Sequence, residues 1–244
     1  MSNLFHVILY QPLLNILIFL YNTIAFGDLG VAIILLTILI RLILFPIFQK
    51  SARHQKRMQE IQPKIKKLQE QHKNDKEKQA KAMLELYKEH NLNPFSGFLL
   101  LLVQIPILIA LYRVFAKSLA PESLSGLYSF ISPPLHLNFS FLGLISLAES
   151  NILIVGLAAF LQYLQGKLSL TKPEPGHSPT PAERMTRNMV FLGPILTIVV
   201  LSRLPSALGL FWLVSSLFSV GQQLIINRET THNEPLGRIR QKTD

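Results

Sequence analysis

Long apolar runs alternate with strongly charged segments along the chain. A bilayer core about 30 Å thick needs roughly 20 apolar residues as helix. Five stretches meet or approach that length, at residues 4–26, 29–48, 98–115, 142–164 and 189–226. The last is long enough for two spans, and the turn-forming segment 202–206, which contains Pro205, divides it. The pattern therefore predicts an all-α integral membrane protein.

The first apolar run has two interpretations. Pro12 interrupts it, and Gln11, Asn15 and Asn22 fall on one face of a helix. A polar face favours a helix that lies in the membrane interface, and an uncleaved membrane span is the alternative. A cleaved signal peptide is disfavoured, because the run has neither a basic segment before it nor a cleavage site of small residues.

Composition excludes several classes of protein. Hydrophobic residues make up 49% of the chain and charged residues 16%, with a mean hydropathy of +0.34. Soluble domains carry about 25% charged residues, so a soluble enzyme or a disordered chain does not fit. The chain has no cysteine, which excludes disulfides, thiol catalysis and cysteine zinc sites.

The basic residues indicate a topology. Of the 24 Lys and Arg residues, 12 lie within residues 50–88, four within 167–187 and four after Ile226. The positive-inside rule places these three segments in the cytoplasm, together with the C-terminus. The net charge of +10 is then a topology signal, and no nucleic-acid function is needed to explain it.

Spans and topology together predict a linear organisation with five core spans. An N-terminal interfacial or spanning helix (1–28) comes before a first core span (29–49). The remaining segments are a cytoplasmic helical hairpin (50–93), a second span (94–116), an outer loop (117–141), a third span (142–166), a cytoplasmic loop (167–188), a fourth span (189–204), a fifth span (207–226) and a cytoplasmic tail (227–244).

The charged segment after the first core span has a helical pattern. Apolar residues recur at spacings of three and four on both sides of a polar turn at 72–75, namely Met58, Ile61, Ile65 and Leu68 before it and Ala80, Met83 and Tyr87 after it. Connections between adjacent spans are usually much shorter, so this length favours a working helical hairpin. A solvated connector is the alternative.

Arg41 is the most informative residue, because it lies deep inside an apolar run. A buried arginine costs several kcal/mol unless it meets water or a partner, and no Asp or Glu lies deep in any predicted span. The neutral candidates to face it are Gln104, Gln162, Gln165, Ser215, Ser216 and Ser219. One interpretation is a wet cavity in which Arg41 attracts a negative charge. The other is a structural arginine that is held by helix-end carbonyls.

The sequence contains no motif for metal binding, phosphate binding or hydrolysis. The seven histidines lack metal-ligand spacing, and no phosphate-binding loop or hydrolase motif is present. Coupled ion transport is hard to build without an intramembrane carboxylate. We therefore expect no metal, no cofactor and no catalytic residues.

Six short motifs, in this order, resemble the YidC/Oxa/Alb family of membrane protein insertases over residues 9–228. They are YQPL (10–13), TILIRLILFP (37–46), QPKI (62–65), LYK with NP (86–88 and 93–94), QIPI with ALY (104–107 and 110–112) and PSALGLFW (205–212). The resemblance implies five core helices around a hydrophilic groove that opens to the cytoplasm and to lipid and is closed outside.

The resemblance also implies site residues. Arg41 would line the groove, with Thr37 and Gln104 near it and with contributions from Gln165 and Trp212. Gln162, three residues earlier, is the alternative to Gln165 at this position of the family pattern. An acidic substrate tail would be drawn to Arg41, and the apolar segment behind it would slide into lipid.

The implied partners are nascent membrane proteins and the lipid bilayer, with the ribosome and the Sec translocon as further candidates. The implied location is the bacterial inner (plasma) membrane, in a multi-pass short form without a large extracytoplasmic domain. Few basic residues follow Ile226, which weakens the case for a ribosome-binding tail. The insertase is not an enzyme. The alternatives are an anion channel or carrier that uses Arg41 for selectivity, and a structural scaffold.

Overall fold

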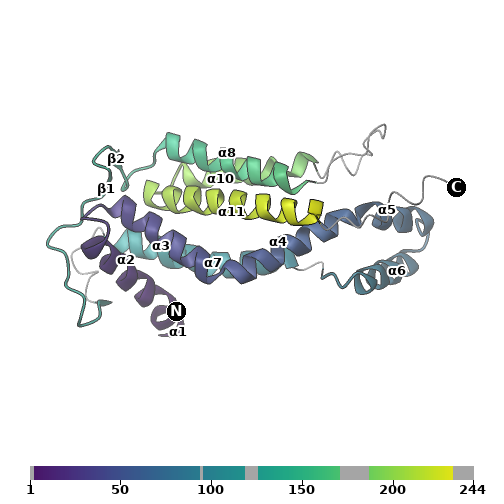
Figure 1. Ribbon diagram of the computed structural model, residues 1–244, viewed down its shortest axis with the longest axis horizontal. Helices are drawn as coiled ribbons and strands as arrows, with labels where there is room; N and C mark the ends of the chain where they lie inside the picture. The colour runs from purple at the N-terminus through teal and green to yellow at the C-terminus, as the bar shows by residue number, and fades with distance from the viewer. Residues whose placement is uncertain (1–2, 94–95, 119–125, 171–186, 233–244) are drawn as a thin grey trace.

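Helices account for most of the computed structural model, which confirms the expected all-α character (Figure 1). The structure describes residues 3–93, 96–118, 126–170 and 187–232. Most of the predicted cytoplasmic loop and tail, and part of the predicted outer loop, lie outside these residues. The elements are α1 (Asn3–Phe5), the π-helix η1 (His6–Tyr10), α2 (Gln11–Thr23), α3 (Leu29–Ile43), α4 (Phe45–Glu60), α5 (Gln62–Gln71), α6 (Lys76–Glu89), α7 (Ser96–Ser118), β1 (Ser140–Phe141), β2 (Ile145–Ser146), α8 (Ile152–Ser169), α10 (Leu192–Leu201) and α11 (Ser206–His232).

Two helices in the described part of the chain are long and apolar enough to cross a membrane by themselves. They are Ile152–Ser169 and Ser206–Glu229, and a third span arises if the bent pair α3 and α4 counts as one. The segments Leu102–Phe115 and Arg187–Leu201 are apolar but shorter. The expected membrane-spanning character is therefore confirmed, while the full count of five spans remains a prediction.

The predicted first core span is broken near its end. Helix α3 ends at Ile43, and the chain bends by 66° at Leu44 into α4. Pro46 is the cause, because proline has no N–H to donate to the Leu42 carbonyl and its ring clashes with that carbonyl in a continuous helix. Residues 45–49, which the sequence analysis assigned to the span, therefore begin α4.

The main core lies between α2, α3, α7 and the first half of α11. Its fully buried members include Leu14, Leu36, Leu111 and Leu208. By contrast, α8 and α10 present large apolar side chains outward, among them Phe160 and Leu196. Contiguous exposed apolar surface of this kind is typical of contact with lipid.

The N-terminal helices hold the described part of the predicted outer loop in place. The Asn15 amide Nδ2 donates to the Gly126 carbonyl at 3.1 Å, and Asn15 Oδ1 accepts from the Tyr128 N–H at 2.7 Å. Gln11 Nε2 also donates to Gly126, and Asn22 Nδ2 donates to the Ser132 carbonyl. The polar face that suggested an interfacial helix thus binds the backbone of this loop.

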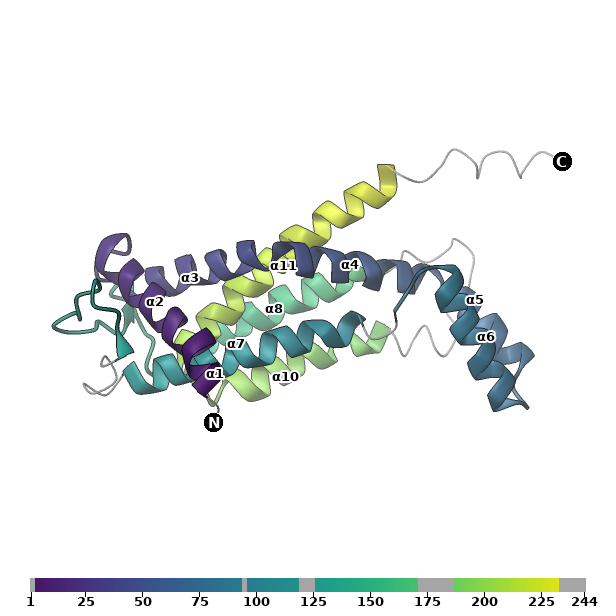
Figure 2. The ribbon, with the colours of Figure 1, turned by 90° about the horizontal axis from the view of Figure 1, so that it is seen from below.

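The helices α5 and α6 form a hairpin at the opposite end of the molecule from β1 and β2 (Figures 1 and 2). Its small core joins Ile61, Leu86 and Leu92. Pro63 divides the first predicted helix, so that α4 ends at Glu60 and α5 begins at Gln62. The Asp75 carboxylate caps α6 by accepting from the Lys78 N–H at 3.0 Å, and this hydrogen bond lowers the pKa of Asp75.

Candidate functional site around Arg41

Arg41 lies in the last turn of α3, and 8% of it is exposed. Its guanidinium carbon lies 4.4 Å from the centroid of the Phe48 ring, which belongs to α4. Its Nη1 atom is buried and has no hydrogen-bond partner among the described residues. A cation over an aromatic ring gains about 0.5–2 kcal/mol, whereas an unpaired buried donor costs about 1–3 kcal/mol. Arg41 is therefore held in place and still has an unused donor.

Thr37 lies one turn before Arg41 and is fully buried. Its hydroxyl donates to the Ile33 carbonyl at 2.6 Å within α3, so its donor is already used. Gln104 is half-buried on α7, a helix that packs against α4. No hydrogen bond within the described part of the chain joins Gln104 to Arg41.

The two predicted contributors from later helices lie in different surroundings. Gln165 is half-buried on α8, and its main-chain carbonyl accepts from the Ser169 hydroxyl. Trp212 is half-buried on α11 and packs against the apolar cluster of Val155, Ala158 and Leu201. The competing residue Gln162 accepts a hydrogen bond from Thr197, which ties α8 to α10.

Six buried polar atoms have no hydrogen-bond partner among the residues that the structure describes. They are Arg41 Nη1, Gln49 Oε1, His54 Nδ1, Gln59 Oε1, Ser215 Oγ and Gln222 Nε2. Buried polar groups are usually paired, so such a set calls for an explanation. Arg41 and Ser215 are residues that the sequence analysis singled out. Gln49 and Gln222 were missed, although each sits within or beside an apolar run.

The helices α4 and α11 contact each other along part of their length, and we call this contact the α4–α11 seam. The rings of Phe45 and Phe218 meet edge to face with their centroids 6.3 Å apart. Further along both helices, the Arg53 guanidinium donates to the Glu229 carboxylate at 3.0 and 3.1 Å. These two contacts join the helices at separate points of the seam.

Asn227 fastens the far end of the seam. Its Oδ1 accepts from Lys56 Nζ at 2.7 Å and from Gln223 Nε2 at 3.2 Å, and its Nδ2 donates to the Leu168 carbonyl at 2.9 Å. One side chain thus links α4, α8 and α11. The neighbouring pair of Arg53 and Glu229 is largely exposed to solvent and contributes at most about 1 kcal/mol.

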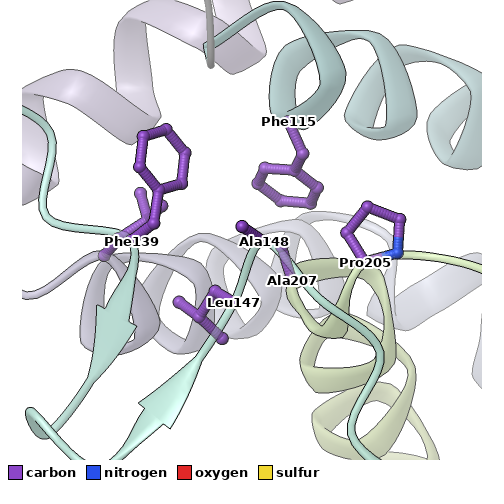
Figure 3. Close-up of a pocket in the computed structure, with 7 residues that line it drawn as sticks. Phe115, Phe139, Leu147, Ala148, Pro205 and Ala207 are labelled. Atoms are coloured by element: carbon purple, nitrogen blue, oxygen red, sulfur yellow. The ribbon is translucent and has the colours of Figure 1, made fainter.

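The opposite end of the bundle is apolar and closely packed. Figure 3 shows Phe115, Phe139, Leu147 and Pro205 around a small cavity of about 10 Å³. Main-chain hydrogen bonds close this end further, with the Ser206 N–H donating to the Glu149 carbonyl and the Ala207 N–H to that of Leu147. A cavity of this size and lining stays dry, because it offers a water molecule no polar partners.

Comparison with known proteins identifies the family. The profile of the 60Kd inner membrane protein family matches residues 19–234. Proteins named Membrane protein insertase YidC from Francisella tularensis subsp. novicida (strain U112) and subsp. holarctica (strain LVS) are each 35% identical over 210 residues, which is 85% of this chain and 34% of the relative. The chain therefore spans about a third of the length of these curated relatives. It belongs to the 60Kd inner membrane protein family, and its resemblance to the YidC/Oxa/Alb insertases is confirmed.

Proposed function

We propose that this chain is a membrane protein insertase, which moves apolar segments of nascent membrane proteins from the cytoplasm into the lipid bilayer. The name of the relatives, Membrane protein insertase YidC, supports this activity. The observation that carries the proposal is Arg41, a buried cation with an unused donor and no carboxylate partner in the described part of the chain. The activity makes and breaks no covalent bond, so the protein is not an enzyme.

In the proposed mechanism, Arg41 offsets part of the cost of bringing a substrate carboxylate into the membrane. The interaction between unlike charges strengthens as the local dielectric falls, so a fixed cation can capture an acidic tail. A site that keeps some water limits the strength of this pair and lets the tail leave again. The apolar segment behind the tail then partitions into lipid along the exposed apolar faces of α8 and α11.

The groove itself is part of the proposal. It comprises five core helices around Arg41, Thr37, Gln104, Gln165 and Trp212, with an opening to the cytoplasm and to lipid. Two observations support a closed outer side, namely the apolar packing around Phe115 and Pro205 and the small size of the cavity there. The same packing argues against an anion channel, because a channel needs a continuous polar path.

Topology and partners complete the proposal. The predicted organisation places the hairpin and the C-terminus in the cytoplasm of a bacterial inner membrane, following the positive-inside rule. The basic, helical surface of α5 and α6 is suited to meeting a ribosome or a Sec translocon, and nascent membrane proteins are the substrates.

Insertion into proteoliposomes tests the function. The substrate is a small single-span protein with an acidic N-terminal tail, presented to vesicles that contain the wild-type chain or Arg41→Ala. With wild-type vesicles, we expect the substrate tail to cross the membrane and so to resist added protease. With Arg41→Ala vesicles, the protease should digest most of the tail. Insertion at equal rates by both would assign Arg41 a structural role. Chloride conductance without insertion would support the channel instead.

A further inference from the structure

Two buried glutamines, one on α4 and one on α11, each have an amide atom without a hydrogen-bond partner among the described residues. Gln49 follows Phe45 by one helical turn on α4, and Gln222 follows Phe218 by one turn on α11. Arg53 and Glu229 lie on the same two faces and are bonded to each other. Along their helices, Gln49 and Gln222 therefore each lie between the aromatic contact and the ion pair that join α4 to α11.

Both glutamines are buried and unsatisfied. Their exposed fractions are 7% for Gln49 and 6% for Gln222. Gln49 Oε1 and Gln222 Nε2 have no hydrogen-bond partner among the described residues. A buried amide atom without a partner is costly, and a leucine of similar size would avoid that cost. The fold thus keeps one unused acceptor on α4 and one unused donor on α11, each one turn beyond the contact of Phe45 with Phe218.

This combination matches one chemical group in particular. A peptide unit carries one N–H donor and one C=O acceptor, each of which must be satisfied away from water. Gln49 Oε1 can accept the N–H, and Gln222 Nε2 can donate to the C=O. A carboxylate would use only the donor, so the pair favours a neutral main-chain group over an acidic side chain.

We propose that Gln49 and Gln222 bind a main-chain peptide group of an extended substrate segment, with Gln49 eight residues after Arg41 in the direction of the α5–α6 hairpin. This inference rests on the proposed insertase function and deepens it. Arg41 selects for negative charge, whereas the glutamine pair lowers the cost of an unpaired backbone whatever the side chains are. The pair would therefore support tails of many sequences.

Binding of a tail peptide to the full chain in lipid nanodiscs tests this directly. The probe is a fluorescent, neutral peptide of the substrate tail, made once with normal amide bonds and once with successive amides replaced by esters. An ester lacks the N–H but keeps a carbonyl. We expect wild type to bind the amide peptide roughly three- to tenfold more tightly than the ester peptide, the range of about one hydrogen bond.

The variants Gln49→Leu and Gln222→Leu separate recognition from structure. Gln49→Leu should bind both peptides equally, because the acceptor for the N–H is gone. Gln222→Leu should weaken both peptides and keep the difference between them. Both variants should unfold at or above the wild-type temperature, since each removes an unsatisfied buried group.

Gln223→Leu is the matched control. Gln223 is the next residue on α11 and equally buried, but its amide already donates to Asn227 at 3.2 Å. We expect this variant to unfold at a lower temperature and to keep the wild-type preference for the amide peptide. An amide preference that persists in Gln49→Leu would overturn the proposal, as would equal binding of both peptides by wild type.

The insertion assay distinguishes this inference from the proposed function. Wild type that fails to insert substrate but shows the Gln49-dependent amide preference would contradict the insertase function and support peptide binding by the two glutamines. Normal insertion by wild type, together with leucine variants that bind both peptides as wild type does, would support the insertase function and contradict peptide binding by the two glutamines.

Discussion

The guanidinium carbon of Arg41 lies 4.4 Å from the centroid of the Phe48 ring, so an aromatic face from α4 covers the buried cation at the end of α3. The two residues are seven positions apart, on either side of the 66° bend at Leu44. The bend at Pro46 therefore helps to decide what Arg41 meets. The ring positions the arginine without neutralising it.

Charge at position 41 should matter more than the shape of the guanidinium group. We expect Arg41→Lys to retain most insertion activity for a substrate with an acidic tail, because lysine keeps the positive charge. Arg41→Glu should abolish it, because a second negative charge repels the tail. Complementation of an insertase-depleted strain measures both variants, and equal growth with Lys and Glu would contradict the charge mechanism.

The ring at position 48 should be replaceable only by another aromatic ring. Phe48→Leu removes the π face over Arg41 and should destabilise the protein by about 0.5–2 kcal/mol. Phe48→Tyr keeps the face and should unfold near the wild-type temperature. Thermal unfolding in detergent, followed by loss of soluble protein, gives the comparison. A leucine variant as stable as the tyrosine variant would show that the ring contributes nothing to holding the cation.

Gly30 is required by the close approach of β1 to the start of α3. A Cβ atom there would lie 2.3 Å from Cδ2 of Phe141, well inside van der Waals contact. We expect Gly30→Ala to lower the stability by about 1–3 kcal/mol, the usual cost of overpacking. Gly156→Ala on α8 is the control, because its Cβ would meet open space. Unfolding temperatures should fall for the first variant and hold or rise for the second.

Asn15 should be the main attachment of the outer loop. It is 1% exposed, and its amide bonds both Gly126 and Tyr128. Asn15→Ala leaves the Tyr128 N–H without its partner and the Gly126 carbonyl with only the Gln11 amide, and should cost about 1–3 kcal/mol. Limited proteolysis should then cut the chain sooner within residues 126–138. Asn22→Ala, which removes one exposed bond to Ser132, should leave the cleavage rate nearly unchanged.

The Asp75 cap should make the start of α6 sensitive to acid. The hydrogen bond from the Lys78 N–H lowers the pKa of Asp75 in the folded hairpin below its usual value of 3.8. The unfolded hairpin then binds the proton more readily, so the cap stabilises α6 above about pH 4 and is lost as the pH falls through the lowered pKa.

Amide hydrogen exchange over α6 measures this effect at pH values above and below 4. Protection in wild type should fall toward that of Asp75→Ala as the pH is lowered, while the variant itself should lose little. An equal fall in both proteins would assign the acid sensitivity to other groups.

The sequence by itself determined the membrane class, the positions of the apolar helices, the helical hairpin and the unusual arginine. Apolar length and helical periodicity are local properties, and the bilayer leaves few alternatives for a long apolar run. The resemblance to the insertase family also came from short local motifs, and the family profile confirmed it over residues 19–234.

Only the tertiary structure decided which polar groups are paired. The helices α4 and α11 meet through Phe45 and Phe218, residues more than 170 positions apart, and one turn beyond that contact Gln49 and Gln222 are buried with an unpaired amide atom each. In the same way, the polar face of α2 forms hydrogen bonds with the backbone of the loop that begins at Gly126. Periodicity indicates which side of a helix is polar. What that side meets depends on the packing of distant segments, which no local pattern specifies.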